Sequence, residues 1–317
     1  MCYNQSINNY QRHFDRGGSI KNINQIFEMA KSKHGACVAV ACAADAHVLQ
    51  AADAAAKAGI ADFVLVGDDN KIAHVAKECG INLDAFEIEH VSDDAEACKA
   101  AVALVANGRA NALMKGSVDT SAVMRAALDR DSGMRSGKKL SHIAVFELAS
   151  YHKLLFVTDA AINIAPDLGG KKDILTNAIG ALHNLGITRP KVALLGAKEK
   201  ADEKMPVTME YVEIVKEHRD NKFFGDSAII DGPLALDNAV SAESCEIKGI
   251  NSPVGGDADL LFCPDIEAGN ILYKSLAFLA GAKNGGVVIG AKRPIILTSR
   301  ADSAESKLIS IALSVLF

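Results

Sequence analysis

Short apolar runs alternate with longer amphipathic stretches along nearly the whole sequence, and this alternation limits the folds open to it. Gly, Pro, Asp or Asn bounds each short run, as is typical of buried strands. Strands that alternate with helices indicate a largely parallel sheet covered on both faces. The predicted strands are residues 37–43, 63–66, 87–90, 112–114, 143–147, 154–157, 192–195, 227–230, 260–263, 287–289 and 295–298. The predicted helices are residues 44–58, 70–79, 95–106, 120–130, 172–185, 207–218, 235–245, 268–282 and 303–316.

This many strands exceeds a comfortable single parallel sheet, so the sequence predicts two three-layer α/β domains with mostly parallel sheets. The polar, glycine-containing residues 131–139 are the best internal linker, and residues 283–286 are a second candidate. The predicted division is residues 1–21 as an N-terminal extension, residues 22–138 plus 287–317 as a discontinuous first domain, and residues 139–286 as an inserted second domain.

Charge and cysteine content argue against several functional classes. Lys and Arg number 34 against 39 Asp and Glu, a net charge of −5 that disfavours nucleic-acid binding. No apolar run approaches the roughly 18 residues of a membrane helix, and residues 1–21 lack a signal-peptide core. The seven cysteines form no CxxC pair, so we expect reduced thiols in a cytoplasmic protein.

Ligands of parallel sheets bind beyond the carboxyl ends of strands, so the strand-to-helix junctions are the places to search for a site. In the first polar junction, Lys115 supplies charge, Gly116 allows a tight turn, and Ser117 and Thr120 supply hydroxyls suited to phosphate. Asp119 or Thr120 could equally serve only to cap the following helix.

Three further junctions carry polar side chains that could either shape turns or face a ligand. Asp159 and Asn163 directly follow a predicted strand, and Asn270 and Lys274 share one helix face that could simply be solvated. Between them along the chain, Asp231 is either a helix cap or a ligand contact. The adjacent Gly232 fits a turn there, and Pro233 fits a first helical position.

The last junction is the most informative, because Ser299 and Arg300 follow a buried-looking strand just before a helix. Asp302 and Glu305 have the spacing of a capping box, which explains both acids better than catalysis does. Capping does not explain Arg300, since a cation opposes the positive end of the helix dipole. A guanidinium at this position makes sense if it holds an anion such as phosphate.

These junctions together resemble the phosphate acetyl/butyryltransferase family, and the likeness is greater to its butyryl branch. Six stretches match in family order from about residue 36 onward, whereas any one of them alone would be weak evidence. They are LMKGSVDTS, LSHIAVFEL, FVTDAAINIAPDL, DGPLALDNAVS, DLLFCPDIEAGNILYKSL and GAKRPIILTSRADSAESKLISIAL.

The resemblance implies the reversible reaction acyl-CoA plus phosphate giving acyl phosphate plus CoA, with a butyryl-like acyl group. It also implies two α/β domains flanking a cleft, an architecture like that of isocitrate and isopropylmalate dehydrogenases, and a homodimer or larger homo-oligomer. No metal or bound cofactor is expected for the chemistry, and no nucleic acid or membrane as partner. Arg300, helped by Lys115, would hold phosphate against the thioester, and Ser299 or a helix amide would stabilise the oxyanion.

The general base stays open, because the acetyl branch carries a proposed aspartate where this sequence has Ser306. Glu305 and Asp159 are both candidates for this base.

Three other functions also stay open. One is acetyl transfer by the same reaction, and another is a non-catalytic CoA-binding regulatory module. The third is a metal- and nicotinamide-dependent dehydrogenase, for which Asp257 and Asp259 form a lone acidic pair that is better explained as a turn.

Overall fold

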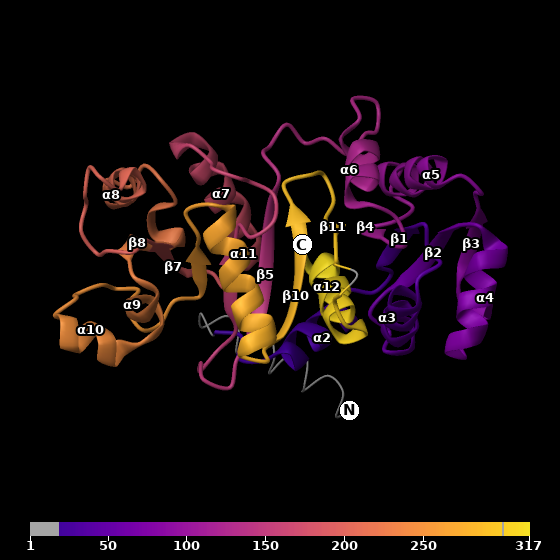
Figure 1. Ribbon diagram of the computed structural model, residues 1–317, viewed down its shortest axis with the longest axis horizontal. Coiled ribbons are helices and arrows are strands. Elements are labelled where there is room, and N and C mark those ends of the chain that lie inside the picture. The colour runs from indigo at the N-terminus through magenta and orange to yellow at the C-terminus, as the bar shows by residue number, and fades with distance from the viewer. Residues whose placement is uncertain (1–18, 300) are drawn as a thin grey trace, which may run out of the picture. The chain divides into compact units, whose positions relative to one another are not determined.

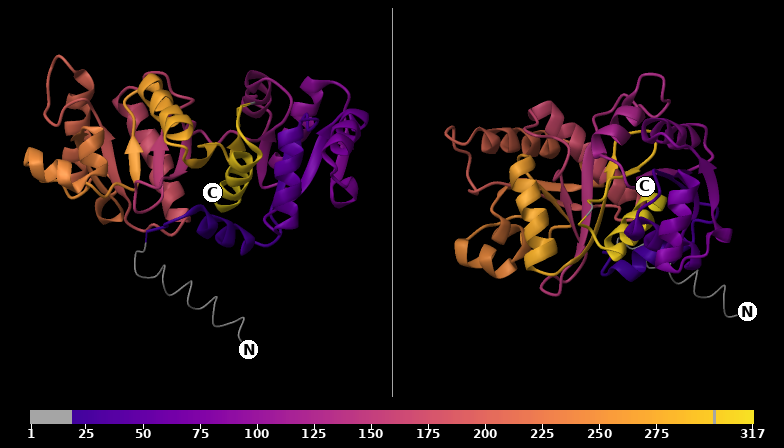
Figure 2. Two further views of the ribbon diagram at one scale, coloured as in Figure 1. Left: turned by 60° about the horizontal axis from the view of Figure 1, so that its bottom comes forward. Right: turned by 45° about the vertical axis from the view of Figure 1, so that its right-hand side comes forward.

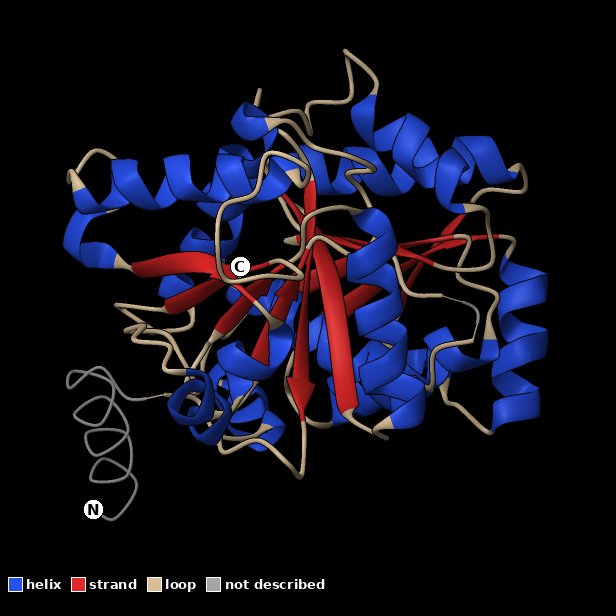
Figure 3. Cartoon of the chain, turned by 60° about the vertical axis from the view of Figure 1, so that its left-hand side comes forward, coloured by secondary structure: helices blue, strands red, loops and turns tan. Residues whose placement is uncertain are grey.

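A computed structural model describes residues 19–299 and 301–317 of the chain (Figure 1). The chain divides into two compact units. We call residues 23–140 with 283–317 the split unit, and residues 141–282 with 19–22 the central unit. Each has a mostly parallel sheet between helices, so the predicted α/β class is confirmed, and Figure 3 shows the helices in blue around the red strands.

The split unit consists of a six-stranded sheet in the order β3-β2-β1-β4-β11-β10, in which only β10 runs antiparallel to its neighbour β11. Its strands are β1 (Cys37–Ala41), β2 (Asp62–Gly67), β3 (Glu87–His90), β4 (Ala112–Lys115), β10 (Lys283–Ile289) and β11 (Ile295–Ile296). Its helices are α2 (Ile23–Lys31), α3 (Ala46–Lys57), α4 (Asp69–Cys79), η1 (Leu83–Ala85), α5 (Asp94–Ala106), α6 (Thr120–Leu128) and α12 (Ala304–Leu316).

Helices cover both faces of this sheet. Helix α12 packs against α2, α3 and β10 on one face, and α5 packs against α6 on the other (Figures 1 and 2). Local signals set the helix ends. An Asp68 carboxylate oxygen accepts the backbone N–H groups of Asn70 and Lys71 at the start of α4, and Gly80 ends that helix with φ of 66°.

The central unit has a five-stranded sheet in the order β5-β6-β9-β7-β8, parallel except for the β5–β6 pair. Its strands are β5 (Ser141–Glu147), β6 (Leu155–Thr158), β7 (Lys191–Leu195), β8 (Ile229–Leu234) and β9 (Leu260–Phe262). Its helices are α7 (Leu168–Asn184), α8 (Pro206–Arg219), η2 (Gly225–Ser227), α9 (Leu236–Val240), α10 (Ala242–Lys248), α11 (Ile266–Lys274) and η3 (Ser275–Leu279).

Side chains of β9 alternate between two apolar layers, as the pleat of a strand requires. Leu261 and Cys263 lie in a cluster with Leu272 and Tyr273 of α11. Phe262 instead contacts the ring of Tyr211 on α8, with ring centroids 6.1 Å apart. The continuously apolar strand is therefore buried on both faces, which explains its sequence pattern.

Residues 283–286, predicted as a possible linker between the domains, follow directly on the division between the two units at residues 282 and 283, but they form the first part of β10 and not a loop. The glycines in this strand serve close packing. A Cβ on Gly285 would lie 2.6 Å from a methyl group of Ile309 on α12, and the Gly286 N–H donates to Ser310 Oγ at 2.9 Å. Glycine here lets α12 approach the strand backbone.

The prediction of Pro233 at the first position of a helix is also wrong, because Gly232 and Pro233 lie inside β8. This strand is at the edge of the sheet, where a residue without an N–H donor is tolerated. Within residues 19–299 and 301–317, no helix is long and apolar enough to span a lipid bilayer.

Candidate functional site

The first and last of the predicted polar junctions follow β4 and β11, which are neighbouring strands in the sheet of the split unit. Strand β4 pairs in parallel with β11, with Leu113 beside Ile295 and Met114 beside Ile296. Lys115 at the end of β4, Ser117 in the loop that follows it and Ser299 in the segment after β11 therefore lie at the same edge of the sheet, at the carboxyl ends of neighbouring strands. This is the position at which parallel sheets bind ligands.

The loop after β4 is held against the loop after β1. The backbone N–H of Gly116 donates to Ala41 O at 2.8 Å, and that of Ser117 donates to Cys42 O at 2.7 Å. A Cβ on Gly116 would lie 2.2 Å from the Cys42 carbonyl oxygen, so only glycine fits. Close backbone approach, which the sequence had suggested only as a tight turn, is thus the reason for this glycine.

Lys115, the last residue of β4, is buried, and its Nζ reaches into this loop and donates to the carbonyl oxygens of Val118 at 3.0 Å and Gly116 at 3.3 Å. The ammonium therefore shapes the loop from inside. Ser117 is exposed, and Thr120 is the first residue of α6 and is also exposed. The loop thus offers hydroxyl groups and the amino end of a helix to an anion.

The turn that contains Ser299 is organised by Asp302 and by a buried lysine that the sequence analysis missed. The Ser299 N–H donates to the Asp302 carboxylate at 2.6 Å. Nζ of Lys307 donates to the backbone carbonyls of Asp302 at 2.8 Å and Ser299 at 3.0 Å. Burial lowers the pKa of Lys307, although Asp302 and Asp45 act in the opposite direction. Position 307 gave no signal in the sequence, because it lies within a predicted helix.

The capping-box prediction for Asp302 and Glu305 is wrong. Ser303 is the N-cap of α12, and its Oγ accepts the N–H of Ser306 at 3.1 Å. Asp302 does not cap the helix, because its carboxylate accepts the Ser299 N–H of the preceding turn. Glu305 lies on the surface, 3.2 Å from Lys283 Nζ. Arg300 lies outside the described residues.

Thr298 adds a second hydroxyl next to Ser299. Its side chain is buried, and Oγ1 has no hydrogen-bond partner among the residues that the structure describes. A buried hydroxyl without a partner is costly, on the order of 1–3 kcal/mol. The carboxyl end of β11 therefore has an unused hydrogen-bonding group close to Ser299.

In the central unit, Asp159 organises a turn at the carboxyl end of β6. Its carboxylate accepts the N–H groups of Ala161 at 2.9 Å, Ile162 at 3.0 Å and Asn163 at 3.2 Å, and Nδ2 of Asn163 at 2.6 Å. Four donors fill the lone-pair positions of one carboxylate. This geometry favours the turn interpretation of Asp159 and Asn163 over a free general base.

Helix α11 packs its first turn onto this same turn. A Cβ on Gly269 would lie 2.1 Å from Asp159 O, and Nδ2 of Asn270 donates to Ala160 O at 3.1 Å. The structure therefore brings Asp159, Asn163 and Asn270 together. Lys274, one turn further, is exposed, with Nζ 5.9 Å from the ring centroid of Phe278.

Asp231 does not join this group. It lies within the edge strand β8, which β9 and β7 separate from β6 in the sheet. Its carboxylate accepts Ser252 Oγ at 2.6 Å and a guanidinium N–H of Arg219 at 3.1 Å. The helix-cap prediction for Asp231 is wrong, because the strand continues through Gly232 and Pro233, and its contacts are those of a structural residue.

A cavity of about 600 Å³ lies in the central unit beyond the carboxyl ends of β7 and β9. Its lining is mostly apolar and includes Leu195, Leu236 and Leu272. An ion pair between Lys171 and Glu210, 2.7 Å apart, lies at its wall. The cavity can hold an apolar group with a polar end.

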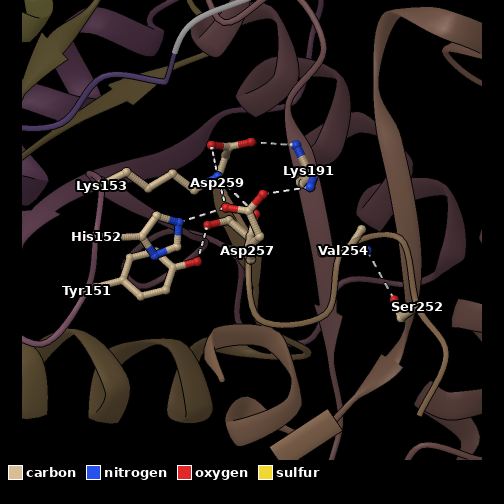
Figure 4. A network of polar contacts seen from close by, with 9 residues as sticks. Tyr151, His152, Lys153, Lys191, Ser252, Val254, Asp257 and Asp259 are labelled. Atoms are coloured by element: carbon tan, nitrogen blue, oxygen red, sulfur yellow. Dashed lines mark hydrogen bonds and ion pairs between the residues drawn. The ribbon is translucent and has the colours of Figure 1, made fainter. Parts of the chain in front are cut away.

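The acidic pair Asp257 and Asp259 belongs to an ion-pair network at the opposite, amino ends of the strands (Figure 4). Lys153 Nζ lies 2.6 Å from Asp259 and 2.9 Å from Asp257, and Lys191 Nζ lies 2.6 Å from Asp257. Burial alone would raise the pKa of Asp257. Hydrogen bonds from Lys191, Lys153 and His152 outweigh it and hold that pKa well below its usual range. These carboxylates therefore form ion pairs with lysines, and the prediction of a turn did not include these ion pairs.

Comparison with known proteins agrees with the motif pattern. The family model described as "Phosphate acetyl/butaryl transferase" matches residues 22–100 and 89–315. Phosphate butyryltransferase of Clostridium acetobutylicum is 43% identical over 94% of this chain and 98% of its own. Phosphate acetyltransferase of Rhizobium meliloti is 41% identical over 92% of each chain.

A solved structure gives the same result at the level of the fold. The branched-chain phosphotransacylase from Enterococcus faecalis superposes with a TM-score of 0.79 and is 35% identical, covering 89% of this chain and 98% of that one. The resemblance inferred from the six motifs is therefore confirmed. The chain belongs to the phosphate acetyl/butyryl transferase family.

Proposed function

We propose that this protein transfers a short-chain, butyryl-like acyl group reversibly between coenzyme A and inorganic phosphate. A phosphate oxygen attacks the thioester carbonyl carbon, the carbon–sulfur bond breaks, and CoA leaves as its thiolate. The products are the acyl phosphate and CoA. The observation that carries this proposal is the 43% identity to a phosphate butyryltransferase over nearly the whole of both chains.

The split unit supplies the groups that this reaction needs. Phosphate is already largely dianionic near neutral pH, so it needs positioning more than deprotonation. Arg300, the hydroxyl of Ser117 and the amino end of α6 at Thr120 hold it, while buried Lys115 and Gly116 fix the loop. Ser299 donates to the oxyanion that forms at the thioester carbonyl. Preorganised donors of this kind each contribute about 2.7–4 kcal/mol to lowering a barrier.

The central unit supplies binding surface for the acyl-CoA. Asn163 and Asn270 lie at the carboxyl ends of its strands, where amide groups can bind the thioester or the pantetheine arm. The general base for the reverse reaction is Glu305 or Asp159, and the four donors that already surround the Asp159 carboxylate favour Glu305. A Glu305→Gln variant that keeps the full rate of acyl-CoA synthesis at every pH would remove Glu305.

The acyl preference has a second candidate, acetyl, because a phosphate acetyltransferase is 41% identical to this chain. One methylene in an apolar slot changes specificity by only about 1–3 kcal/mol. Direct comparison of acetyl-CoA, butyryl-CoA and isobutyryl-CoA as substrates decides this point.

We also place the protein in the cytoplasm as a homo-oligomer. The free thiols of all the described cysteines support a reducing compartment.

The decisive experiment follows CoA release from each acyl-CoA with and without phosphate. We expect strict phosphate dependence, the highest kcat/KM with butyryl-CoA, and a loss of at least about 10²-fold in Arg300→Ala. Arg189→Ala, which removes an exposed arginine 3.7 Å from Asp226, is the matched control and keeps the wild-type rate. Acyl-CoA binding without phosphate-dependent release would instead indicate a non-catalytic CoA-binding module.

A further inference from the structure

The hydroxyl of Thr298 is buried at the carboxyl end of β11 and has no use within the described part of the protein. The side chain is 6% exposed, and Oγ1 has no hydrogen-bond partner among residues 19–299 and 301–317. Burying a hydroxyl without a partner is unfavourable, because the group gives up its hydrogen bonds to water. A polar group left in this state therefore calls for a partner that the folded chain itself does not supply.

Two other threonines are as deeply buried, and both use their hydroxyls within the protein. Oγ1 of Thr158 donates to His142 O at 2.7 Å. Oγ1 of Thr208 accepts the Asp202 N–H at 2.8 Å and donates to Asp202 O at 3.2 Å. Burial of a threonine hydroxyl in this fold thus goes with a partner, and Thr298 departs from that pattern.

Thr298 lies next to the loop that holds phosphate in the proposed reaction. Strand β11 pairs in parallel with β4, with Ile296 beside Met114. Carried two residues further, this register sets Thr298 beside Gly116. Gly116 begins the loop that carries the exposed hydroxyl of Ser117. The unused hydroxyl is therefore at the same edge of the sheet as the proposed phosphate ligands.

The amino end of α6, which follows this loop, also suits an anion. Asp119 is at the N-cap position, but its side chain makes no capping hydrogen bond. At the start of α4, by contrast, the Asp68 carboxylate accepts two backbone N–H groups. The side chain of Asp119 thus does not take up the first-turn N–H groups of α6, and the positive end of the helix dipole favours an anion there.

We propose that Thr298 is a further phosphate-binding residue, whose hydroxyl donates a hydrogen bond to the inorganic phosphate substrate. A phosphate dianion has acceptor oxygens on every side, so it can take up this donor in addition to those of Ser117 and Arg300. Hydrogen bonds to an ionised acceptor are stronger than those between neutral groups. Binding of phosphate then gives the buried hydroxyl the partner that the protein lacks. The inference rests on the proposed use of phosphate as a substrate.

The test compares Thr298→Val, which keeps the shape of the side chain and removes the hydroxyl, with Thr298→Ser, which keeps the hydroxyl. In the CoA-release assay, we expect Thr298→Val to raise KM for phosphate at least about tenfold and to leave KM for butyryl-CoA within about twofold of wild type. Thr298→Ser should keep KM for phosphate close to the wild-type value. Calorimetric titration of inorganic phosphate into the intact protein measures the same loss of affinity without turnover.

Stability separates this role from a structural one, because the two predict opposite signs. Thr298→Val removes a buried hydroxyl that has no partner within the protein, so the free energy of unfolding should stay unchanged or rise. Thr208→Val is the matched control, since it removes a buried hydroxyl that has partners. It should lower the free energy of unfolding in urea and leave both KM values unchanged.

Several outcomes would overturn the inference. One is a Thr298→Val protein that keeps the wild-type KM and affinity for phosphate. Another is a Thr298→Val protein that loses stability as Thr208→Val does and raises both KM values alike. A Thr298→Ser protein that loses as much phosphate affinity as Thr298→Val also overturns it, because the hydroxyl is then not responsible.

Failure of the proposed reaction would give a different result. A wild-type protein that binds phosphate but releases no CoA overturns acyl transfer, while weaker phosphate binding by Thr298→Val still supports the role of Thr298. A wild-type protein that neither binds phosphate nor depends on it for CoA release overturns both.

Discussion

The ammonium of Lys153 lies 2.6 Å from a carboxylate oxygen of Asp259, and both side chains are buried. The other carboxylate oxygen of Asp259 accepts the Lys191 N–H at 2.8 Å, and its backbone carbonyl accepts the Phe156 N–H at 2.8 Å. One aspartate thus connects the amino ends of β6, β9 and β7. The network in Figure 4 maintains the alignment of the strands whose other ends carry the candidate site.

Removing the buried lysine is expected to be costly. Lys153→Met leaves the Asp259 carboxylate buried without its countercharge, so we expect the free energy of unfolding to fall by about 3–5 kcal/mol. Lys191→Met is the control, because its ammonium contacts the partly exposed Asp257 and should contribute less than about 1 kcal/mol. Urea unfolding at pH 7 measures both, and equal losses would contradict the distinction.

The same network predicts that the free energy of unfolding depends on pH in the acid range. The folded state holds the pKa of Asp257 below its ordinary value of 3.8, so its contribution is present above about pH 4. That contribution is lost as the pH falls through the lowered pKa. In urea unfolding between pH 5 and pH 2, Asp257→Asn should show a shallower decline in stability than wild type. Asp226→Asn, which removes an exposed carboxylate, should keep the wild-type decline.

The close approach at Gly116 predicts a large effect from one methyl group. Gly116→Ala places a Cβ 2.2 Å from the Cys42 carbonyl oxygen, so the loop after β4 must move. We expect a stability loss of about 1–3 kcal/mol and a larger loss of phosphate-dependent activity. Gly180→Ala on α7 is the control, because a Cβ there meets no atom within 4 Å. It should stabilise the protein by about 0.5–1 kcal/mol in thermal unfolding.

Lys307 is predicted to be a positioning residue for the Ser299 turn. Lys307→Met removes the donor to the Ser299 and Asp302 carbonyls, so the turn loses its shape. We expect kcat/KM to fall about 10²-fold, with KM for phosphate rising more than KM for butyryl-CoA. Lys200→Met, at an exposed position, serves as the control. Unchanged kinetic constants in a folded Lys307→Met protein would exclude this role.

The spacing of the apolar runs was sufficient to predict the α/β class, because a strand that is buried on both faces has a continuously apolar sequence. Local signals failed where tertiary packing gave a residue another task. Gly285 was read as part of a linker, yet α12 requires it for close contact. Pro233 was read as a helix start, yet an edge strand tolerates it. Lys307 could not be foreseen, since its burial depends on a turn folded back over it.

The order of strands in the split unit has a consequence for synthesis of the chain. Strands β10 and β11 and helix α12 all come from residues 283–317, yet β11 lies directly beside β4. Until residues 283–317 leave the ribosome, β4 has an open edge and the Ser299 turn does not exist. The central unit can fold before these residues have been made, whereas the split unit, and with it any catalytic competence, requires them.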